Sequence, residues 1–305
     1  MTHSLRHRCL FTALIAGVLI NGATAQDFTQ VQIRTTPVAD GVWTLQGSGG
    51  NLGLVVGDQG AFLIDDQYAP LTEKIQAAIA EVTDEPIRFV FNTHWHGDHT
   101  GGNENLAETG ALIVAHDNVR RRLASGQLLE FFNVEVPPAA DGALPVVTFN
   151  DSVTFHLGGH TVYAEHVANA HTDGDSIVHL VEADVIHSGD LVFYGMYPFV
   201  DYSSGGSLSG MVRAADRILD MAGNDTKIIA GHGGPIITRA QMSEYRDLLD
   251  SVDQRMRTLI EQGQTLEQII ASDVLAEYDT FWGSGFINAE RWLDMIYSGM
   301  TGESG

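Results

Sequence analysis

The segment His94-Trp95-His96-Gly97-Asp98-His99 concentrates more metal-binding chemistry than any other part of the chain, with three imidazoles and one carboxylate within six residues. Burying an imidazole or a carboxylate without a partner costs free energy, so structure alone explains such a density poorly. His94 and His96 project to the same side of a locally extended chain and could share one metal ion, while Asp98 and His99 turn towards a second. The alternative, a solvated histidine-rich loop, is disfavoured by further matches along the chain.

The pattern H-x-H-x-D-H, placed after a strand-like run, resembles the signature of the metallo-β-lactamase-fold hydrolases. The resemblance covers residues 40–262 and implies three further ligands. His171 resembles the third ligand of the first metal, Asp190 the carboxylate that bridges both metals, and His232 the last ligand of the second. The resemblance therefore implies two divalent metal ions. Zn²⁺ suits these imidazole and carboxylate donors best, and Fe or Mn are alternatives.

The residues around Asp190 favour one branch of that family. Many true metallo-β-lactamases carry Cys or Ser at this place, and those with Cys place a Lys where this chain has Phe193. The hydroxyacylglutathione hydrolases (glyoxalase II type) and the lactonases carry Asp instead. The segments 197–201 and 204–207 are similar to a periplasmic subgroup labelled quinoprotein relay system or SoxH-like. The missing Lys disfavours β-lactamase as the main activity.

The resemblance implies a metal-dependent hydrolase. Two ions would lower the pKa of a bridging water from 15.7 towards about 7, and the resulting hydroxide would attack a carbonyl carbon. Asp98 is the candidate catalytic residue, because it could orient the nucleophile and pass on a proton. Esters, lactones, thioesters and amides all fit this chemistry. The alternatives are a β-lactamase proper and, from another class, a non-catalytic periplasmic accessory protein that keeps a metal site for stability.

Aromatic residues near these loops are candidates for the wall of a small-molecule pocket, with an ordinary core position as the alternative for each. Trp95, Phe193 and Tyr194 are the candidates for direct contact with a substrate. The same role is open to Phe131, Phe132, Met196 and Tyr197.

Metal ligands need hydrogen-bond partners of their own. We expect such a partner at His187, or at Asp173 or Asp175, which flank His171. The Gly-rich stretch 47–53 lacks the G-x-G-x-x-G spacing of a phosphate-binding loop, so we expect a hairpin connection near the site.

The first 25 residues carry the pattern of a secretory signal peptide. Arg6 and Arg8 precede an apolar run over 10–20, and Ala25 ends a group of small residues before the expected cleavage site. The run is too short to span about 30 Å of hydrocarbon, which disfavours a membrane anchor. Cleavage would remove Cys9, the single cysteine, and with it any thiolate ligand. We therefore expect a periplasmic or secreted protein.

The charge of the chain excludes several classes of partner. The 305 residues include 16 Lys and Arg against 39 Asp and Glu, a formal net charge of -23. Binding to nucleic acid requires clustered cations, as does docking on an anionic membrane surface, so we expect neither. The expected partner is a small-molecule substrate, and the oligomeric state is unknown.

The elements that would position the ligands follow a repeated order of strands and helices. Strands are expected at 42–45, 52–56, 61–64, 87–91, 112–114, 153–157, 162–167, 177–181, 185–187 and 227–230, and helices at 71–82, 118–123, 208–221 and 239–262. Two such halves predict an α/β (α+β) protein with a four-layer αββα sandwich. Residues 124–150 are expected to be irregular. We expect one catalytic domain over 26–262, with a helical, aromatic-rich extension over 263–305 packed on it.

Overall fold

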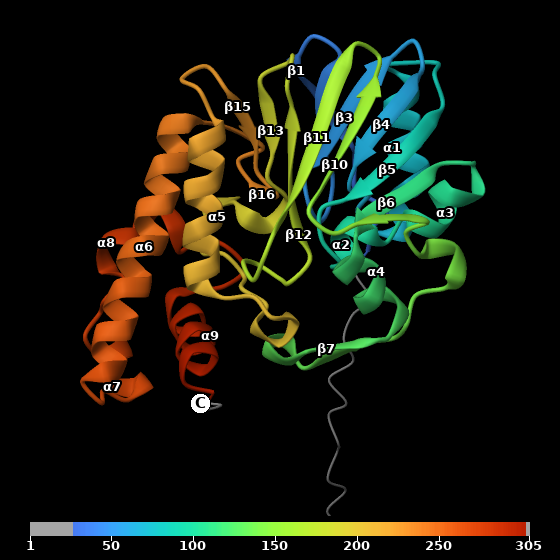
Figure 1. Ribbon diagram of the computed structural model, residues 1–305. Helices are drawn as coiled ribbons and strands as arrows, with labels where there is room; N and C mark the ends of the chain where they lie inside the picture. The colour runs from blue at the N-terminus through green and yellow to red at the C-terminus, as the bar shows by residue number, and fades with distance from the viewer. Residues whose placement is uncertain (1–26, 303–305) are drawn as a thin grey trace, which may run out of the picture.

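The computed structural model describes residues 27–302 and shows two β-sheets packed face to face, with helices on their outer faces (Figure 1). The first sheet has seven strands in the order β1-β2-β3-β4-β5-β6-β9, and the second has six in the order β10-β11-β12-β13-β15-β17. The expected four-layer αββα sandwich is confirmed. The expected signal peptide lies outside the described residues. No helix between residues 27 and 302 has both the length and the apolar character needed to cross a membrane.

The first sheet and its helices come from the N-terminal half of the chain. Its strands are β1 (Arg34–Ala39), β2 (Val42–Gln46), β3 (Leu52–Gly57), β4 (Gly60–Ile64), β5 (Ile87–Asn92), β6 (Leu112–His116) and β9 (Val147–Phe149). The helices of this half are α1 (Thr72–Ala80), α2 (Gly97–Thr100), α3 (Asn103–Glu108) and α4 (Asp117–Ala124). The hairpin expected across residues 57–60 is present, with Gly57 opposite Gly60.

The second sheet and two long helices follow. Its strands are β10 (Ser152–Leu157), β11 (His160–Val167), β12 (Asp175–Leu180), β13 (Val185–His187), β15 (Lys227–Ile229) and β17 (Ile236–Thr238). The helices are α5 (Leu208–Met221) and α6 (Arg239–Glu261). Helix α6 starts with a capping box, in which the side chains of Thr238 and Gln241 bond each other's backbone N–H and so satisfy two free donors.

Strand β4 shows how the sequence produces two buried layers. All of its residues are buried, and successive side chains of a strand point to opposite faces. Phe62 faces the second sheet and packs in one core with Val178 of β12. Leu63 faces the other way and packs with Ile75 of α1. A strand buried on both faces reads as a continuous apolar run, which is what residues 61–64 show.

Residues 124–150 contain a small hairpin that the sequence analysis did not predict. Strands β7 (Gln127–Leu129) and β8 (Val134–Val136) pair antiparallel across a 3₁₀ turn, Glu130–Phe132. The expectation of an irregular segment was wrong here, because strands of three residues are too short to show an alternating pattern. Later sections refer to this element as the β7–β8 hairpin.

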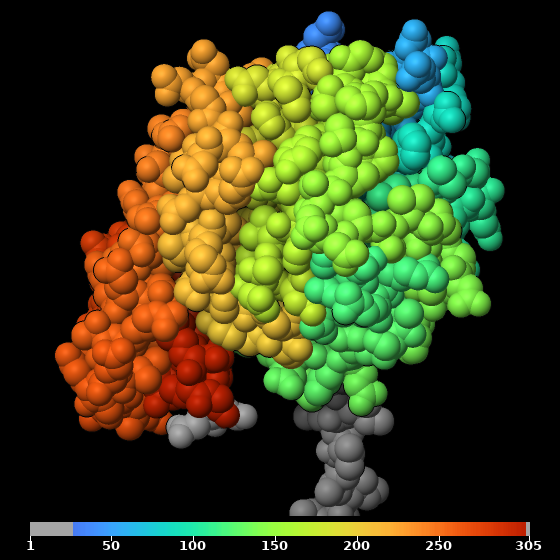
Figure 2. Space-filling model, viewed as in Figure 1, coloured from blue at the N-terminus to red at the C-terminus, as the bar shows by residue number. Residues whose placement is uncertain are grey.

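The C-terminal tail packs on the second half through α7 (Leu266–Ala271), α8 (Ala276–Trp282) and α9 (Ala289–Thr301). In the space-filling view the tail, in orange and red, continues the surface formed by α6 (Figure 2). The ring of Trp292 stacks on Tyr197 with centroids 4.4 Å apart, and its indole N–H donates to Pro198 O at 2.7 Å. The Tyr197 hydroxyl donates to Asp279 at 2.6 Å. The tail therefore holds the segment that starts at Tyr197.

Candidate metal centre

The seven candidate ligands lie in loops and short elements that follow strands of both sheets. Their donor atoms form two groups, and the atoms of each group lie within 4.8 Å of one another. The first group contains His94 and His96 after β5, His171 between β11 and β12, and Asp190 in the 3₁₀ turn Gly189–Leu191. The second contains Asp98 and His99 in α2, and His232 in the two-residue strand β16 (His232–Gly233).

Three buried imidazoles converge in the first group. His96 Nδ1 lies 3.1 Å from His94 Nε2 and 2.9 Å from His171 Nε2. Burial keeps the pKa of His94 well below its usual range, and burial together with the neighbouring His96 lowers the pKa of His171 to about 4. These two rings are therefore neutral at physiological pH. Neutral imidazoles with converging nitrogens are the form that a divalent metal requires.

The second group mixes imidazole and carboxylate donors. His232 Nε2 lies 3.2 Å from Asp98 Oδ2 and 3.4 Å from His99 Nε2. Burial disfavours charge on both imidazoles, but the negative charges of Asp190 and Asp98 outweigh this effect. They raise the pKa of His99 well above its usual range and the pKa of His232 to about 10. Burial also opposes charge on Asp98, yet His99 and His232 lower its pKa to about 2. A cation that binds here would displace protons from the two rings.

Asp190 lies between the two groups. Its Oδ2 is 3.6 Å from His171 Nε2 and 3.2 Å from His232 Nε2. Its buried Oδ1 lies 3.1 Å from His99 Nε2 and has no hydrogen-bond partner. Burial opposes ionisation, but His232 and His99 hold the pKa of Asp190 well below its usual range. An unsatisfied buried carboxylate oxygen is costly, and a cation would satisfy it, so the donor set fits a pair of divalent ions.

The imidazole of His99 is oriented by an aspartate that the sequence analysis missed. His99 Nδ1 lies 2.8 Å from Asp65 Oδ2, and the same carboxylate accepts from Thr93 N and Oγ1 at 2.7 Å. Asp65 directly follows β4 and adopts a positive φ of 61°. Its signal in the sequence is an acidic pair at the end of a buried strand, where a carboxylate reaches the edge of the sheet.

One segment, residues 199–207, orients two ligands of the first group. His96 Nε2 lies 3.0 Å from Asp201 Oδ2, and His171 Nδ1 lies 2.8 Å from Phe199 O. The other oxygen of Asp201 accepts from Ser204 N at 3.1 Å, which closes a tight turn. Such partners fix the tautomer and the direction of a ligand ring.

The orienting residues expected from the sequence have other contacts. Asp175 accepts from Thr172 Oγ1 at 2.6 Å, and Asp173 pairs with Arg122 at 2.7 Å. His187 bonds backbone groups: its Nδ1 accepts from Gly189 N at 3.2 Å, and its Nε2 bonds Asn51 O. These residues shape the ligand loops and make no hydrogen bond to a ligand ring, because local spacing favours turns over long-range bonds.

The glycine-rich stretch joins β2 to β3 and lies against the second group, as expected. A Cβ placed on Gly50 would come within 2.1 Å of His99 Cε1, and one on Gly49 within 2.8 Å of Asp98 Cβ. Glycine is required here because the backbone itself packs against the two ligands.

A cavity of ≈ 510 Å³ opens over both groups. Its floor includes His96, Asp98, Asp190 and His232. The other lining residues are mostly apolar: Tyr68, Trp95, Leu129, Phe132, Val134, Val136, Phe193, Phe199 and Phe286, with Ser48, Gly49 and Gly97.

Phe193 and Tyr194, both expected in the pocket wall, point to different places. They are successive residues of the short strand β14 (Phe193–Tyr194), and successive side chains of a strand project to opposite sides. Phe193 lines the cavity and stacks on His232 with centroids 5.0 Å apart. Tyr194 lies outside that lining and packs edge-on against Phe281 and Trp282.

Comparison with known proteins agrees with this geometry. The family model of the Metallo-beta-lactamase superfamily matches residues 45–255. A hydroxyacylglutathione hydrolase from Erythrobacter litoralis is 33% identical over 108 residues, a match that spans 35% of this chain and 35% of that protein. A "Beta-lactamase-like protein 2 homolog" from Caenorhabditis elegans is 26% identical over 77% of this chain and 71% of its own length.

Solved structures show the same fold. A metallo-beta-lactamase from Pontibacter korlensis superposes with a TM-score of 0.60 at 22% identity, covering 72% of this chain and 99% of that one. The sec-alkylsulfatase Pisa1 from Pseudomonas sp. gives a TM-score of 0.67 at 17% identity, covering 88% of this chain and 50% of that one. With a family match over most of its length and the ligand loops in place, the chain belongs to the metallo-beta-lactamase superfamily.

Proposed function

We propose that the protein is a binuclear hydrolase that cleaves an ester, lactone, thioester or amide bond. Zinc is the metal that suits its ligands best. The observation that carries the proposal is Asp190, whose Oδ2 lies within 3.2 Å of a donor of the second group and 3.6 Å of a donor of the first. A carboxylate in that position suits two ions about 3.5–4 Å apart, the usual spacing of two-metal hydrolases.

The chain's own residues prepare the site for this chemistry. When bound, the two ions supply Lewis acidity for the carbonyl group and make water a better nucleophile at neutral pH. His94, His96 and His171 would hold the first ion, and Asp98, His99 and His232 the second, with Asp190 between them. Asp98 is ionised above about pH 2, and its side chain is 20% exposed to the cavity. Its ionised carboxylate can therefore accept a hydrogen bond from water and orient it, while the further role of passing on a proton is proposed from the family resemblance alone.

The cavity favours an uncharged group beside the scissile bond. None of the described residues that line it is Lys or Arg, and Phe193 stands where a lactam carboxylate would need a cation. The β-lactamase alternative is favoured by the similarity to the metallo-beta-lactamase from Pontibacter and disfavoured by this wall. The non-catalytic alternative is disfavoured because structural zinc sites are closed, whereas these donors open into ≈ 510 Å³ of space.

The test combines metal analysis with a substrate panel. We expect two equivalents of zinc per chain and chelator-sensitive hydrolysis of a neutral ester or lactone. A preparation that binds only one equivalent in excess zinc would contradict the binuclear site. A fully loaded protein that is inactive on chromogenic esters, lactones, thioesters and a cephalosporin would favour the accessory role.

We further propose a periplasmic or secreted location after cleavage behind Ala25, and a catalytic domain over 26–262 with 263–305 as an extension. The pattern at the N-terminus supports the first proposal, and the burial of Trp292 in one core with α5 and α6 supports the second. N-terminal sequencing of protein from a periplasmic extract tests the cleavage site.

A further inference from the structure

The outer wall of the metal-site cavity comes from two segments that lie outside the ligand loops. The β7–β8 hairpin contributes Leu129, Phe132, Val134 and Val136, and the connection between α8 and α9 contributes Phe286. Phe286 also lies beyond residues 45–255, the part matched by the superfamily. Phe286 therefore adds to the cavity wall from outside the part of the chain that the superfamily match covers.

Two rows of aromatic rings run from the surface to the metal donors. Phe286, which is 54% exposed, lies 6.4 Å from Phe193, whose ring stacks on His232 of the second group at 5.0 Å. In the second row of the same lining, Phe132 is 37% exposed and lies 4.9 Å from Phe199. Together the two rows form an apolar slot that leads from solvent to both halves of the candidate metal centre.

The second aromatic row also ends at a ligand. Phe199 lies 5.7 Å from the ring of His96 in the first group. Val134, 47% exposed, continues the apolar surface along the rim. Exposed apolar side chains that border a cavity mark a surface that is covered when a ligand binds.

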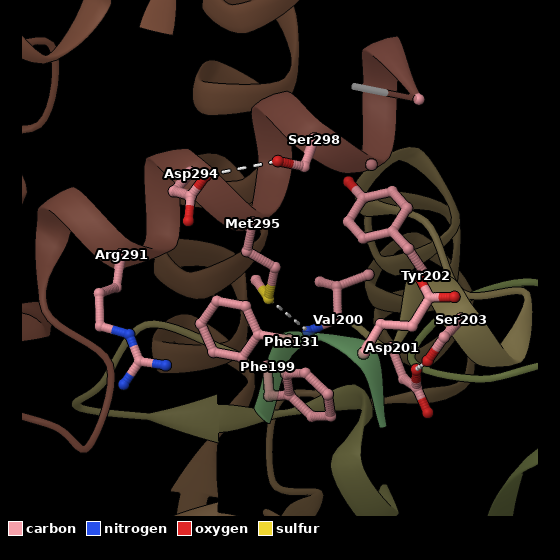
Figure 3. Close-up of a pocket in the computed structure, with 13 residues that line it drawn as sticks. Phe131, Phe199, Val200, Asp201, Tyr202, Ser203, Arg291, Asp294, Met295 and Ser298 are labelled. Atoms are coloured by element: carbon pink, nitrogen blue, oxygen red, sulfur yellow. Dashed lines mark hydrogen bonds between the residues drawn. The ribbon is translucent and has the colours of Figure 1, made fainter. Parts of the chain in front are cut away.

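One arginine of the tail is directed elsewhere. Arg291 lines a separate cavity of ≈ 440 Å³, which Phe199 also lines, together with Asp201 and Met295 (Figure 3). Its guanidinium lies over the ring of Phe131, 4.7 Å from the centroid. Among the described lining residues of the slot, the charged groups are the acids and imidazoles of the candidate metal centre.

We propose that this slot binds the hydrocarbon chain of an uncharged ester, thioester or lactone, and that Phe132 and Phe286 set the preference for chain length. The slot ends at the metal donors, so its occupant is the part of the substrate attached to the scissile group. The substrate class named here rests on the proposed hydrolase function. The binding of a hydrocarbon chain does not, because it can be measured without turnover.

The experiment uses a binding series and a turnover series on the zinc-loaded full chain. The binding probes are 2-pentanone, 2-heptanone, 2-nonanone and 2-undecanone, measured by calorimetry, with octyl sulfate as an anionic probe. The turnover probes are p-nitrophenyl esters with acyl chains of two to eight carbons. Because each buried methylene contributes hydrophobic stabilisation, affinity and kcat/KM should rise about two- to fourfold per methylene until the slot is filled.

Two variants and one matched control locate the effect. Phe132→Ser and Phe286→Ser should each reduce the gain from the shortest to the longest ketone at least about fivefold. Phe281→Ser is the control, since Phe281 is 50% exposed in the same tail but contacts Tyr194 and Trp282 and lies outside the cavity lining. It should leave the series unchanged.

The outcomes separate this inference from the proposed function. Ketone affinity that rises with chain length in the absence of any hydrolysis would support the slot and count against the hydrolase substrate class. Hydrolysis with a flat chain-length series would overturn the slot and leave the hydrolase. Tighter binding of octyl sulfate than of 2-nonanone would overturn the preference for uncharged groups. A change of oligomeric state in Phe286→Ser, with an unchanged series, would assign the rim to contact between copies of the chain and also overturn the proposal.

Discussion

Replacing Asp201 with Asn should weaken metal binding although Asp201 belongs to neither group of candidate ligands. The Asp201 side chain is 1% exposed, and its Oδ2 lies 3.0 Å from His96 Nε2. Because His96 Nδ1 faces the cluster and must be unprotonated to bind a metal, Nε2 carries the proton and donates it to Asp201. Burial opposes ionisation of Asp201, but the bond from His96 keeps its pKa well below the usual range.

The amide of Asn cannot reproduce both contacts of the carboxylate. One oxygen of Asp201 accepts from His96, and the other accepts from Ser204 N at 3.1 Å and from Ser203 Oγ at 2.5 Å. An amide has one oxygen, so its NH₂ group must face a donor on one side or the other. Losing such a partner typically costs 10–100-fold in metal affinity, which corresponds to about 1.4–2.8 kcal/mol.

Competition with a chromogenic chelator measures the affinity for each of the first two zinc equivalents. The electronic spectrum of the cobalt-loaded variant reports whether the geometry around His96 has changed. Asp173→Asn is the matched control, because Asp173 lies two residues from His171 but pairs with Arg122 and contacts no ligand ring. A variant Asp201→Asn that binds both equivalents with wild-type affinity and spectrum would refute the reasoning.

Three further changes test the site and its surroundings. His96→Ala should lower kcat by at least about 10³ while circular dichroism stays native, since the first ion loses a nitrogen ligand; near-normal turnover would place the chemistry elsewhere. Wild-type kcat/KM should favour neutral esters over penicillins by at least about tenfold, and Phe193→Lys should narrow that gap because a charge-assisted contact contributes about 1.5–3 kcal/mol. Burial and the stacked ring of His166 lower the pKa of His116 to about 4, so its contribution to stability is complete above about pH 6.5 and is lost as the pH falls towards 4. An NMR titration that gave His116 a pKa near 6.5 would contradict this last expectation.

The long helices and the ligand loops could be predicted because their signals are local. Helix α5 matches the predicted range 208–221, since its apolar residues recur at helical spacing on one face. The three histidines and the aspartate of residues 94–99 occur within one short segment, which makes their shared role visible in the sequence. His171, Asp190 and His232 lie far apart in the chain and were found only through the family resemblance. The structure places all three beside that segment.

The residues that orient the ligands carry a weaker signal. Asp65 belongs to an acidic pair at the end of a strand, but nothing local distinguishes it or Asp201 as a ligand partner among 39 acidic side chains, and their partners His99 and His96 lie 34 and 105 positions away. Composition and spacing favour the nearer acids, and they therefore indicate Asp173 and Asp175. Only the packing of the two sheets decides which carboxylate reaches a ligand ring.

The tail shows how a distant segment can affect the site without contributing a ligand. Trp292 stacks on Tyr197 and donates to Pro198 O, which fixes the start of the segment whose next residues orient the first metal group. From the same tail, Phe286 reaches the rim of the cavity. Under the proposed function, one packed unit therefore serves both the orientation of ligands and the recognition of substrate. A change in the tail core should alter metal affinity and chain-length preference together, whereas a change at Phe286 should alter chain-length preference alone.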